Sequence, residues 1–234
     1  MTESVIFLLD VDNTLLDNDR FIADFRHRLE SELGDTRAGR YWTILATLRN
    51  KLGYVDYLGA LQRYRDDMER EDSAEDERQL LQFSSFLLDY PYDQRLYPRA
   101  LDVITYLGRF GRTVILSDGD VVLQPRKLHT SGLWDAVDGR VLIYIHKEQM
   151  LDAVHRRYPA RHYVMIDDKL RILAAMKEIW QDRITTIFPR QGHYALDPAE
   201  LAGHPDADFT IEHIGDLADA DLAPLLTPST RRTH

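Results

Sequence analysis

The segment that most constrains the fold lies at the start of the chain. Five apolar residues, Val5–Leu9, run directly into Asp10 and Asp12. A continuous apolar run of this length is typical of a strand buried on both faces of a parallel sheet, and such sheets place their chemistry at the carboxyl ends of their strands. Residues two positions apart in an extended strand point to the same side, so the two carboxylates are expected to lie together. Two carboxylates about 4 Å apart repel each other by roughly 4 kcal/mol at an effective dielectric constant of about 20. We therefore expect a cation or an ammonium group beside them.

The acidic pair also has simpler interpretations. For the pair taken alone, a helix cap or a solvated turn remains an alternative interpretation, because short motifs often match by chance. A calcium-binding loop of the EF-hand type does not fit. Counted from Asp10, the sixth position is Leu15 where Gly is needed, and the twelfth is Phe21 where Glu is needed.

Three later segments repeat the pattern of an apolar strand that ends in polar residues. The expected strands are 113–116, 141–145 and 163–166, with a further strand at 183–188. The polar groups after the first three strands are Ser117 with Asp118, then Lys147, then Asp167 with Asp168. Each group alone fits a turn, a solvated side chain or a helix cap. Together at one sheet edge they supply a nucleophile, an acid or base, a hydroxyl donor, an ammonium group and Mg²⁺ ligands, which are the groups that phosphoryl transfer requires.

Amphipathic helices separate these strands, as a sheet of alternating β and α units requires. Two of them are expected at 125–131 and 147–157. Between the first strand and about Arg95, apolar residues recur at helical spacing in four stripes, and no strand signal is present. The first stripe is expected to end at Gly34 and the second at Gly53. We therefore expect an α/β protein with a Rossmann-like parallel sheet flanked by helices, formed by residues 1–17 and 95–234. Residues 18–94 are expected to form an all-helical cap subdomain that closes over the carboxylates.

On these residues the chain resembles the haloacid dehalogenase-like (HAD) superfamily. The four motifs of the superfamily match the segment Asp10-Val11-Asp12-Asn13-Thr14-Leu15, then Ser117, Lys147 and the pair Asp167-Asp168. The similarity spans Val5 to about Phe188, apart from the helical segment, and relatives often carry a helical cap after the first core strand.

The resemblance implies a role for each motif residue. Asp10 attacks phosphorus and forms an aspartyl-phosphate, while Asp12 protonates the leaving oxygen and then deprotonates water. Ser117 donates a hydrogen bond to a phosphoryl oxygen, and Lys147 neutralises charge. The implied ligands of Mg²⁺ are the Asp10 carboxylate, the backbone carbonyl of Asp12, and Asp167 or Asp168. The carboxylates of Asp10, Asp12, Asp167 and Asp168 are expected to cluster around this metal. Thr14 is expected to shape the loop.

The resemblance also implies the class of reaction, with alternatives. An acid at Asp12 favours hydrolysis of a phosphate ester, since relatives that cleave carbon–halogen or phosphorus–carbon bonds lack it. A phosphomutase of the same superfamily remains an alternative, because its core machinery is the same. A catalytically weak protein that binds phospho-ligands or interacts with other proteins is a second alternative. Asp118 favours this second alternative, because an extra acid beside a phosphate site weakens binding or redirects the Ser117 hydroxyl. A two-component receiver domain does not fit, since its acidic pair and its phosphoacceptor lie on different strands.

Composition limits the partners. The net charge of −10 argues against nucleic acid, which requires clustered Lys and Arg. The absence of Cys excludes disulfides and thiolate chemistry. No apolar run approaches the ~20 residues of a membrane span, and the acidic N-terminus does not resemble a signal peptide. We therefore expect a cytoplasmic enzyme that acts on a small phosphorylated metabolite and has neither a nucleic-acid nor a membrane partner. The oligomeric state is not indicated.

Other polar residues carry weaker signals. Four basic residues of the helical segment are candidates for the anionic tail of a substrate, although surface solvation is the simpler interpretation: Arg20, Arg49, Lys51 and Arg63. Arg190 and His193 follow the last expected strand, where an ordinary polar loop is the simpler interpretation. The other histidines considered show no metal-ligand spacing and are assigned no role: His27, His129, His146, His155 and His162.

Overall fold

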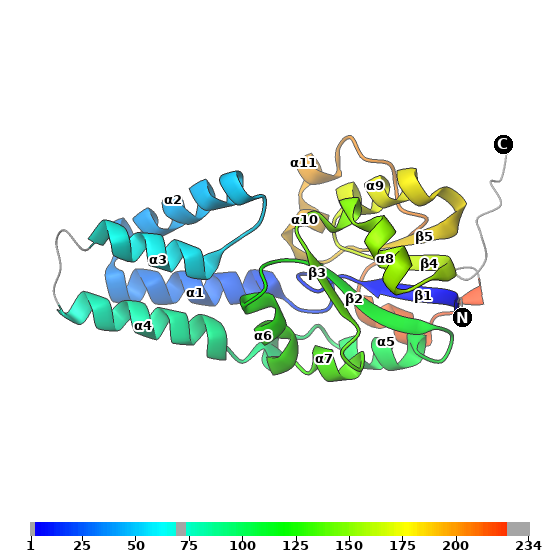
Figure 1. Ribbon diagram of the computed structural model, residues 1–234, viewed down its shortest axis with the longest axis horizontal. Helices are drawn as coiled ribbons and strands as arrows, with labels where there is room; N and C mark the ends of the chain where they lie inside the picture. Colours follow the sequence, from blue (N-terminus) through cyan, green and yellow to red (C-terminus); the bar gives the residue numbers. More distant parts are fainter. Residues whose placement is uncertain (1–2, 69–73, 224–234) are drawn as a thin grey trace.

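The computed structural model describes residues 3–68 and 74–223 (Figure 1). In this part of the chain six parallel strands form one sheet, in the order β3-β2-β1-β4-β5-β6. The strands are β1 Glu3–Leu9, β2 Arg112–Asp118, β3 Val141–Tyr144, β4 Ala160–Ile166, β5 Ile184–Pro189 and β6 Phe209–Ile211. Helices flank the sheet, and the predicted α/β fold class is therefore confirmed.

Helices fall into two groups. Of the five α-helices that the structure describes between β1 and β2, the first four form what we call the helical insertion: α1 Asn18–Leu33, α2 Asp35–Leu52, α3 Tyr57–Met68 and α4 Ala74–Asp89. The others belong to the sheet domain: α5 Ala100–Leu107, α6 Leu123–Thr130, α7 Leu133–Ala136, α8 Leu151–Arg157, α9 Leu170–Trp180, α10 Gly192–Leu196 and α11 Pro198–Leu201. Short 3₁₀ helices complete the fold: η1 Tyr92–Arg95, η2 Lys147–Gln149, η3 Gln181–Arg183 and η4 Ile214–Asp219. No helix of the described ranges combines the length and the apolar composition that crossing a membrane requires.

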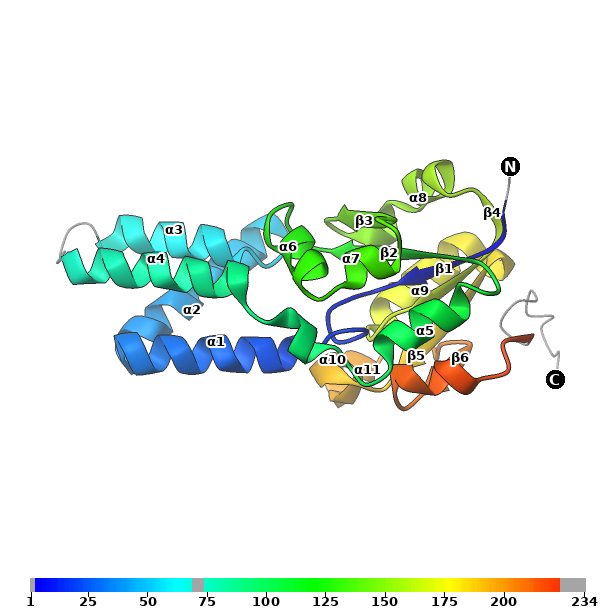
Figure 2. The ribbon, with the colours of Figure 1, turned by 90° about the horizontal axis from the view of Figure 1, so that it is seen from below.

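Strand β1 lies at the centre of the sheet, and its side chains alternate between the two faces. Phe7 and Leu9 pack in an apolar cluster with α5, η4 and the helical insertion. Ile6 and Leu8 pack on the opposite face with residues of α8 and α9. The ribbon shows α5 on one side of the sheet and α8 and α9 on the other (Figures 1 and 2). All four side chains are fully buried, and each contributes about 1.5–3 kcal/mol of hydrophobic stabilisation. This packing fixes the end of β1, where Asp10 follows.

The helical insertion has an aromatic core of its own. The ring of Phe25 lies 5.6 Å from that of Tyr41, 6.5 Å from that of Phe83 and 5.7 Å from that of Phe86. These rings come from α1, α2 and α4, so one residue joins three helices. The first two helices end at Gly34 and Gly53, as their stripes predict.

Two connections join the insertion to the sheet domain, and they run beside each other. Leu16 and Leu96 form an antiparallel bridge. The backbone N–H of Asp17 donates to the carbonyl of Arg95 at 2.7 Å, and that of Tyr97 donates to Leu15 at 2.9 Å. The boundaries at 17/18 and 94/95 stay a prediction; residues 1, 2, 69–73 and 224–234 of the predicted ranges lie outside the described residues.

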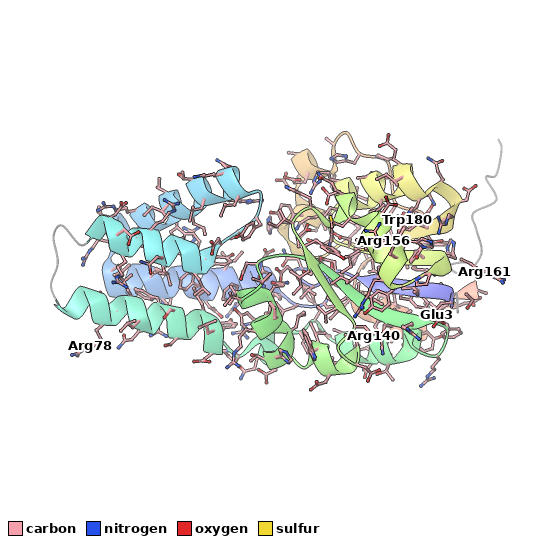
Figure 3. All side chains as sticks on the ribbon, in the orientation of Figure 1. Glu3, Arg78, Arg140, Arg156, Arg161 and Trp180 are labelled. Carbon is pink, nitrogen blue, oxygen red and sulfur yellow. The ribbon has the colours of Figure 1, made fainter. Side chains whose placement is uncertain are left out.

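The carboxyl ends of the strands face the insertion. Glu3 and Arg161, which mark the amino ends of β1 and β4, lie at one end of the elongated molecule, and Arg78 on α4 lies at the other (Figure 3). Chemistry at the carboxyl ends of the strands therefore takes place between the sheet domain and the insertion.

The structure differs from the sequence expectations in several elements. Lys147 does not begin an α-helix; it lies in η2, and α8 starts four residues later at Leu151. The interruption lies at Met150, whose backbone angles of φ −103° and ψ 17° fall outside the α-helical region. Helix α6 starts at Leu123, before Pro125, whose missing N–H is harmless in a first turn. Strand β6 was not expected, because three residues at a sheet edge carry too short a pattern.

Candidate active site

Asp10, Lys147 and Asp167 meet at the carboxyl ends of three strands. Asp10 follows β1, and its backbone N–H donates to the carbonyl of Ile166 on β4 at 3.0 Å. The ammonium group of Lys147 donates a hydrogen bond to Oδ1 of Asp10 and lies 2.7 Å from Oδ2 of Asp167. It also donates to the carbonyl of Leu116 on β2 at 3.2 Å. Both Asp10 and Lys147 are buried, with 4% and 1% exposure.

The charge of Lys147 is stabilised by its acidic surroundings. Burial lowers the pKa of the Lys147 ammonium, but the opposing effects of Asp10, Asp167 and Asp118 outweigh burial and hold that pKa well above its usual value. Lys147 therefore remains a cation and offsets the negative charge around Asp10, as the strand-end pattern of the sequence requires.

Three of the predicted metal ligands form one buried cluster. Asp10, Asp167 and Asp168 each place a carboxylate oxygen within 4.8 Å of the others. Burial raises the pKa of Asp167 to about 6, against the opposing effect of Lys147, and it raises that of Asp168 well above its usual value. Oδ2 of Asp10, Oδ2 of Asp167 and both carboxylate oxygens of Asp168 accept no hydrogen bond from any described residue. Buried oxygens that lack donors match the all-oxygen coordination preferred by Mg²⁺ and Ca²⁺, so the residues present fit a hard divalent cation.

The carboxylate of Asp12 lies outside this cluster. Its Oδ1 pairs with the ammonium of Lys127 on α6 at 2.6 Å. The expectation that four carboxylates gather at one point is therefore corrected to three: residues two positions apart share a side only in an extended strand, and the chain leaves β1 at Leu9. The backbone carbonyl of Asp12 stays a predicted ligand.

Ser117 lies at the end of β2 with its hydroxyl held in place. Its Oγ accepts a hydrogen bond from Nε2 of Gln124 at 2.9 Å and donates to the carbonyl of Asp118 at 3.2 Å. A hydroxyl proton rotates freely about its C–O bond, so the same oxygen can redirect its proton toward a phosphoryl group. Gln124 thus fixes the position of the Ser117 oxygen without fixing the direction of its proton.

Asp118, at the end of β2, is hydrogen-bonded to the turn that carries Lys147. Its Oδ1 accepts a hydrogen bond from the backbone N–H of Lys147 at 2.8 Å. The contact ties the end of β2 to the turn at His146 and Lys147. Asp118 thus fixes the backbone from which the Lys147 side chain extends.

We expect Asp118→Ala to lower kcat/KM about tenfold, because an unsatisfied backbone donor costs about 1–3 kcal/mol and loosens the Lys147 turn. Asp118→Asn keeps an acceptor oxygen and should stay within about threefold of wild type by the same principle. Steady-state kinetics of both variants, with thermal melts as a folding control, measure this difference. Equal losses in the two variants would mean that the charge, and not the hydrogen bond, matters.

The loop after Asp12 is fastened from several sides. Thr14 Oγ1 accepts from the backbone N–H of Asp168 at 3.0 Å, so the first and fourth motifs are joined directly. Asn13, at φ 65°, accepts from the backbone N–H groups of Asn18 and Asp19 and so caps the start of α1. Thr14 thus shapes the loop as predicted.

The insertion contacts the site at two further points. Gly53, in the turn after α2, lies so close to His146 that a Cβ atom there would stand 2.6 Å from the imidazole Nε2. Its φ of 81° also favours glycine. Nη2 of Arg49 donates to the hydroxyl of Tyr194 on α10 at 3.0 Å. Among the four basic candidates of the insertion, Arg49 therefore reaches the sheet domain, whereas Arg20 pairs with Asp24 of its own helix at 3.5 Å.

Four residues near the site carry no recognisable sequence signal. Gln124 and Lys127 lie on α6 and contact the motif side chains of Ser117 and Asp12. Tyr194 contacts Arg49 of the insertion. Lys169 lies with its ammonium 4.7 Å from the ring of Tyr194. Burial lowers the pKa of Lys169, but Asp168, Asp10 and Asp167 raise it by more. His193, one of the weaker sequence candidates, also contacts the insertion: its backbone N–H donates to Asp19 on α1 at 2.7 Å.

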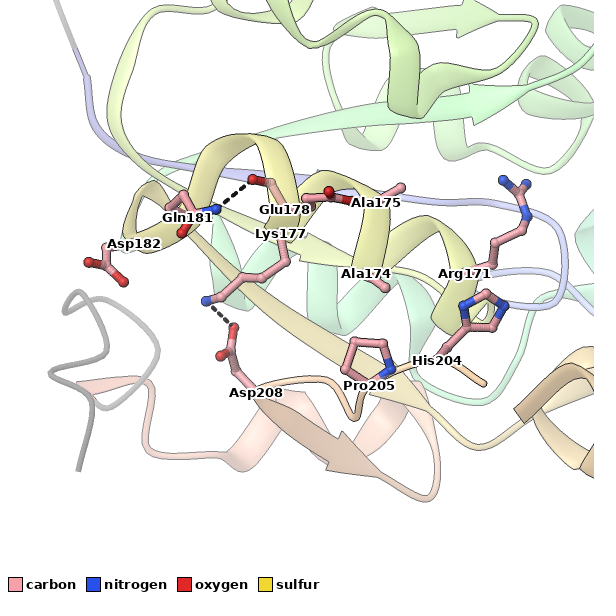
Figure 4. Close-up of a pocket in the computed structure, with 10 residues that line it drawn as sticks. All are labelled: Arg171, Ala174, Ala175, Lys177, Glu178, Gln181, Asp182, His204, Pro205 and Asp208. Carbon is pink, nitrogen blue, oxygen red and sulfur yellow. Dashed lines mark hydrogen bonds and ion pairs between the residues drawn. The ribbon is translucent and has the colours of Figure 1, made fainter. Parts of the chain in front are cut away.

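A surface pocket of about 710 Å³ lies elsewhere, along α9 (Figure 4). It contains the ion pair of Lys177 and Asp208, whose N–O distance is 2.7 Å. None of the predicted site residues lines it, so we do not assign the reaction to this pocket.

Comparison with known proteins agrees with this geometry. The family model for haloacid dehalogenase-like hydrolases matches residues 6–179. The chain therefore belongs to the haloacid dehalogenase-like hydrolase family, as its motifs predict. No curated protein matches the sequence.

Solved structures show the same fold. A protein of Burkholderia xenovorans LB400 described as a haloacid dehalogenase-like hydrolase is 61% identical, with a TM-score of 0.86, and the match covers 93% of this chain and 99% of that one. The HAD-hydrolase YfnB of Bacillus subtilis, solved bound to magnesium, is 17% identical with a TM-score of 0.60 over 92% and 97% of the two chains. The L-2-haloacid dehalogenase of Xanthobacter autotrophicus is 17% identical with a TM-score of 0.59 over 93% and 97%. At these identities the last two show the fold alone.

Proposed function

We propose that the protein is a Mg²⁺-dependent phosphatase that hydrolyses a small phosphate monoester through an aspartyl-phosphate at Asp10. The observation that carries the proposal is the buried cluster of Asp10, Asp167 and Asp168 beside Lys147, with the acid Asp12 two residues after Asp10. A nucleophile, a cation site and an acid beside one another are what a two-step phosphoryl transfer needs.

Within the cluster, Asp168 is the better direct ligand of the metal. Oδ1 of Asp167 accepts from the backbone N–H of Lys169 at 2.9 Å, and Oδ2, although it accepts no hydrogen bond, forms an ion pair with the ammonium of Lys147 at 2.7 Å. Both oxygens of Asp168 lack a donor among the described residues. When bound, the metal would orient the phosphoryl group and offset its charge. The B. subtilis neighbour was solved bound to magnesium, and we propose the same metal for this protein.

The first chemical step breaks the ester bond. A carboxylate oxygen of Asp10 attacks phosphorus, and the ester oxygen leaves with a proton from Asp12. Lys147 offsets the added charge, and Ser117 donates its hydroxyl proton to a phosphoryl oxygen. In the second step Asp12 takes a proton from water, the resulting hydroxide attacks phosphorus, and inorganic phosphate leaves while the Asp10 carboxylate is restored.

The acid at position 12 favours an oxygen leaving group. An alkoxide is a poor leaving group and needs a proton as it departs, so a general acid accelerates cleavage of an ester by roughly 10²–10⁴-fold. A halide departs without protonation and would not need Asp12. The fold similarity to haloacid dehalogenases therefore does not make dehalogenation the preferred activity.

We further propose that the helical insertion is a cap that selects the substrate. It packs over the carboxyl ends of the strands and contacts the turn of Lys147 through Gly53. Its two connections to the sheet domain lie side by side, an arrangement suited to hinge motion that admits substrate and then excludes water.

Arg49→Ala tests the cap. We expect it to change relative kcat/KM among esters that carry a second anionic group by about tenfold or more, while acetyl phosphate changes less than about threefold, because a charge-assisted contact contributes about 1.5–3 kcal/mol. Arg63→Ala, an exposed arginine of the same insertion, is the matched control. An equal response of the two variants, or an unchanged preference in Arg49→Ala, would move specificity to the sheet domain.

A substrate panel tests the proposed function as a whole. Purified protein with Mg²⁺ is given phosphorylated sugars, phosphorylated hydroxy acids, nucleotides and p-nitrophenyl phosphate, with L-2-chloropropionate alongside. We expect release of inorganic phosphate and no release of chloride. Chloride release without phosphate release would replace the proposal by dehalogenation, and conversion of one sugar phosphate to another without phosphate release would indicate a phosphomutase.

A further inference from the structure

We infer that Lys127 is a positioning residue for Asp12, and that it ties the orientation of this acid to the place where the helical insertion joins the sheet domain. The inference rests on the proposed role of Asp12 in phosphate ester hydrolysis. It assigns a function to a residue of α6 that belongs to none of the four motifs.

The ammonium group of Lys127 lies in a closed cage. Its side chain is 2% exposed, and the Nζ atom donates to Oδ1 of Asp12 at 2.6 Å and to Oδ1 of Asn18 at 3.0 Å. The rings of Phe21 and Tyr92 stand 5.5 Å and 5.6 Å from Nζ, within cation–π range. A buried ammonium is costly without an anionic partner, and Asp12 is the carboxylate with which Lys127 pairs. The ion pair therefore holds Asp12 as firmly as it stabilises Lys127.

The same cage joins three parts of the chain. Lys127 comes from the sheet domain, while Asn18 and Phe21 begin the first helix of the insertion, and Tyr92 lies in η1 on the return connection. Any rotation of the insertion about its two connections must carry Asn18, Phe21 and Tyr92 with it. Lys127 is thus placed where it couples such a rotation to the carboxylate of Asp12.

This arrangement has a chemical consequence. With Oδ1 bound to Lys127, Asp12 is restricted to a narrow set of side-chain orientations, so its other oxygen is the one available to a leaving group. A fixed acid is more effective than one that samples several rotamers, because the reacting atoms must be held close to the productive geometry. Loss of Lys127 should therefore resemble loss of Asp12, and not a general loss of stability.

The dependence of kcat/KM on the leaving group distinguishes a loss of Asp12 function from a general loss of stability. We expect Lys127→Met to lower kcat/KM by about 100-fold for an alkyl phosphate, which needs a proton on its leaving oxygen, and by less than about threefold for acetyl phosphate, which does not. Asp12→Asn should show the same pattern, and the double variant should be no slower than Asp12→Asn alone, because both changes act through one group. Lys177→Met is the matched control, since it removes an ion-paired lysine outside the site.

A structural measurement gives an independent readout. In crystals of Lys127→Met we expect the Asp12 carboxylate to adopt a different side-chain orientation from wild type. Equal losses for both substrates, or an additive double variant, would overturn the inference, as would an unmoved Asp12. If the wild-type protein hydrolyses no phosphate ester, the proposed function fails, and the crystallographic comparison still decides whether Lys127 orients Asp12. If Lys127→Met does not fold, Lys127→Gln takes its place with the same expected results.

Discussion

Asp10→Asn lowers the rate of phosphate ester hydrolysis by roughly a thousandfold or more, because a neutral amide cannot form the acyl-phosphate intermediate. Asp10 follows the central strand of the sheet, is buried, and binds the ammonium of Lys147. The variant keeps its volume and its position, and Lys147 keeps Asp167 as a partner. Initial rates with p-nitrophenyl phosphate, wild type against variant, measure the loss.

Asp152→Asn controls for the removal of one carboxylate, since Asp152 is exposed on α8. It should leave the rate unchanged. A thermal melt of Asp10→Asn should show a folded protein, so that the loss is chemical. Turnover near the wild-type level in folded Asp10→Asn would remove Asp10 from the role of nucleophile.

Chelation should abolish activity, and added Mg²⁺ should restore it. The cluster of Asp10, Asp167 and Asp168 is buried, and the donor-free oxygens of Asp10 and Asp168 require a cation for full compensation of their charge. We expect less than about 1% of the activity after chelation, with Ca²⁺ a poor substitute because it favours more ligands at longer distances.

Binding of the metal can be followed without activity. Mg²⁺ should raise the melting temperature of wild type, since a ligand that binds the folded state stabilises it. Asp168→Asn should lose most of that rise, and Asp152→Asn should retain it. Full activity in excess chelator, or an equal thermal response in both variants, would refute the metal site.

The positions of the strands and the chemistry at their ends could be predicted from the sequence. Val5–Leu9 is apolar throughout because β1 is covered on both faces, and this pattern belongs to the local sequence. The same reasoning placed Asp10, Lys147 and Asp167 together, because parallel strands bring their carboxyl ends to one edge. Gly34 and Gly53 ended the first two helices of the insertion as expected.

What could not be predicted depends on contacts between distant segments. Lys127 lies 115 residues from Asp12, on an amphipathic helix where a lysine is ordinarily solvated. The role of Asp118 depends on the left-handed turn at His146, and no pattern in the sequence predicts that turn. Strand periodicity would group Asp12 with the other carboxylates, but that periodicity applies only up to the end of β1 at Leu9. Side-chain direction outside regular structure is set by tertiary partners.

The covalent intermediate tests the central claim most directly. Asp12→Asn, in which hydrolysis of the intermediate is slowed, is mixed with Mg²⁺ and p-nitrophenyl phosphate, quenched in acid and digested, and the peptides are weighed by mass spectrometry. We predict one added phosphoryl group on the peptide that contains Asp10, and no such peptide from the Asp10→Asn variant. Phosphate release by the wild-type protein with no phosphoryl group on Asp10 in this experiment, or a phosphoryl group on another residue, would contradict the account.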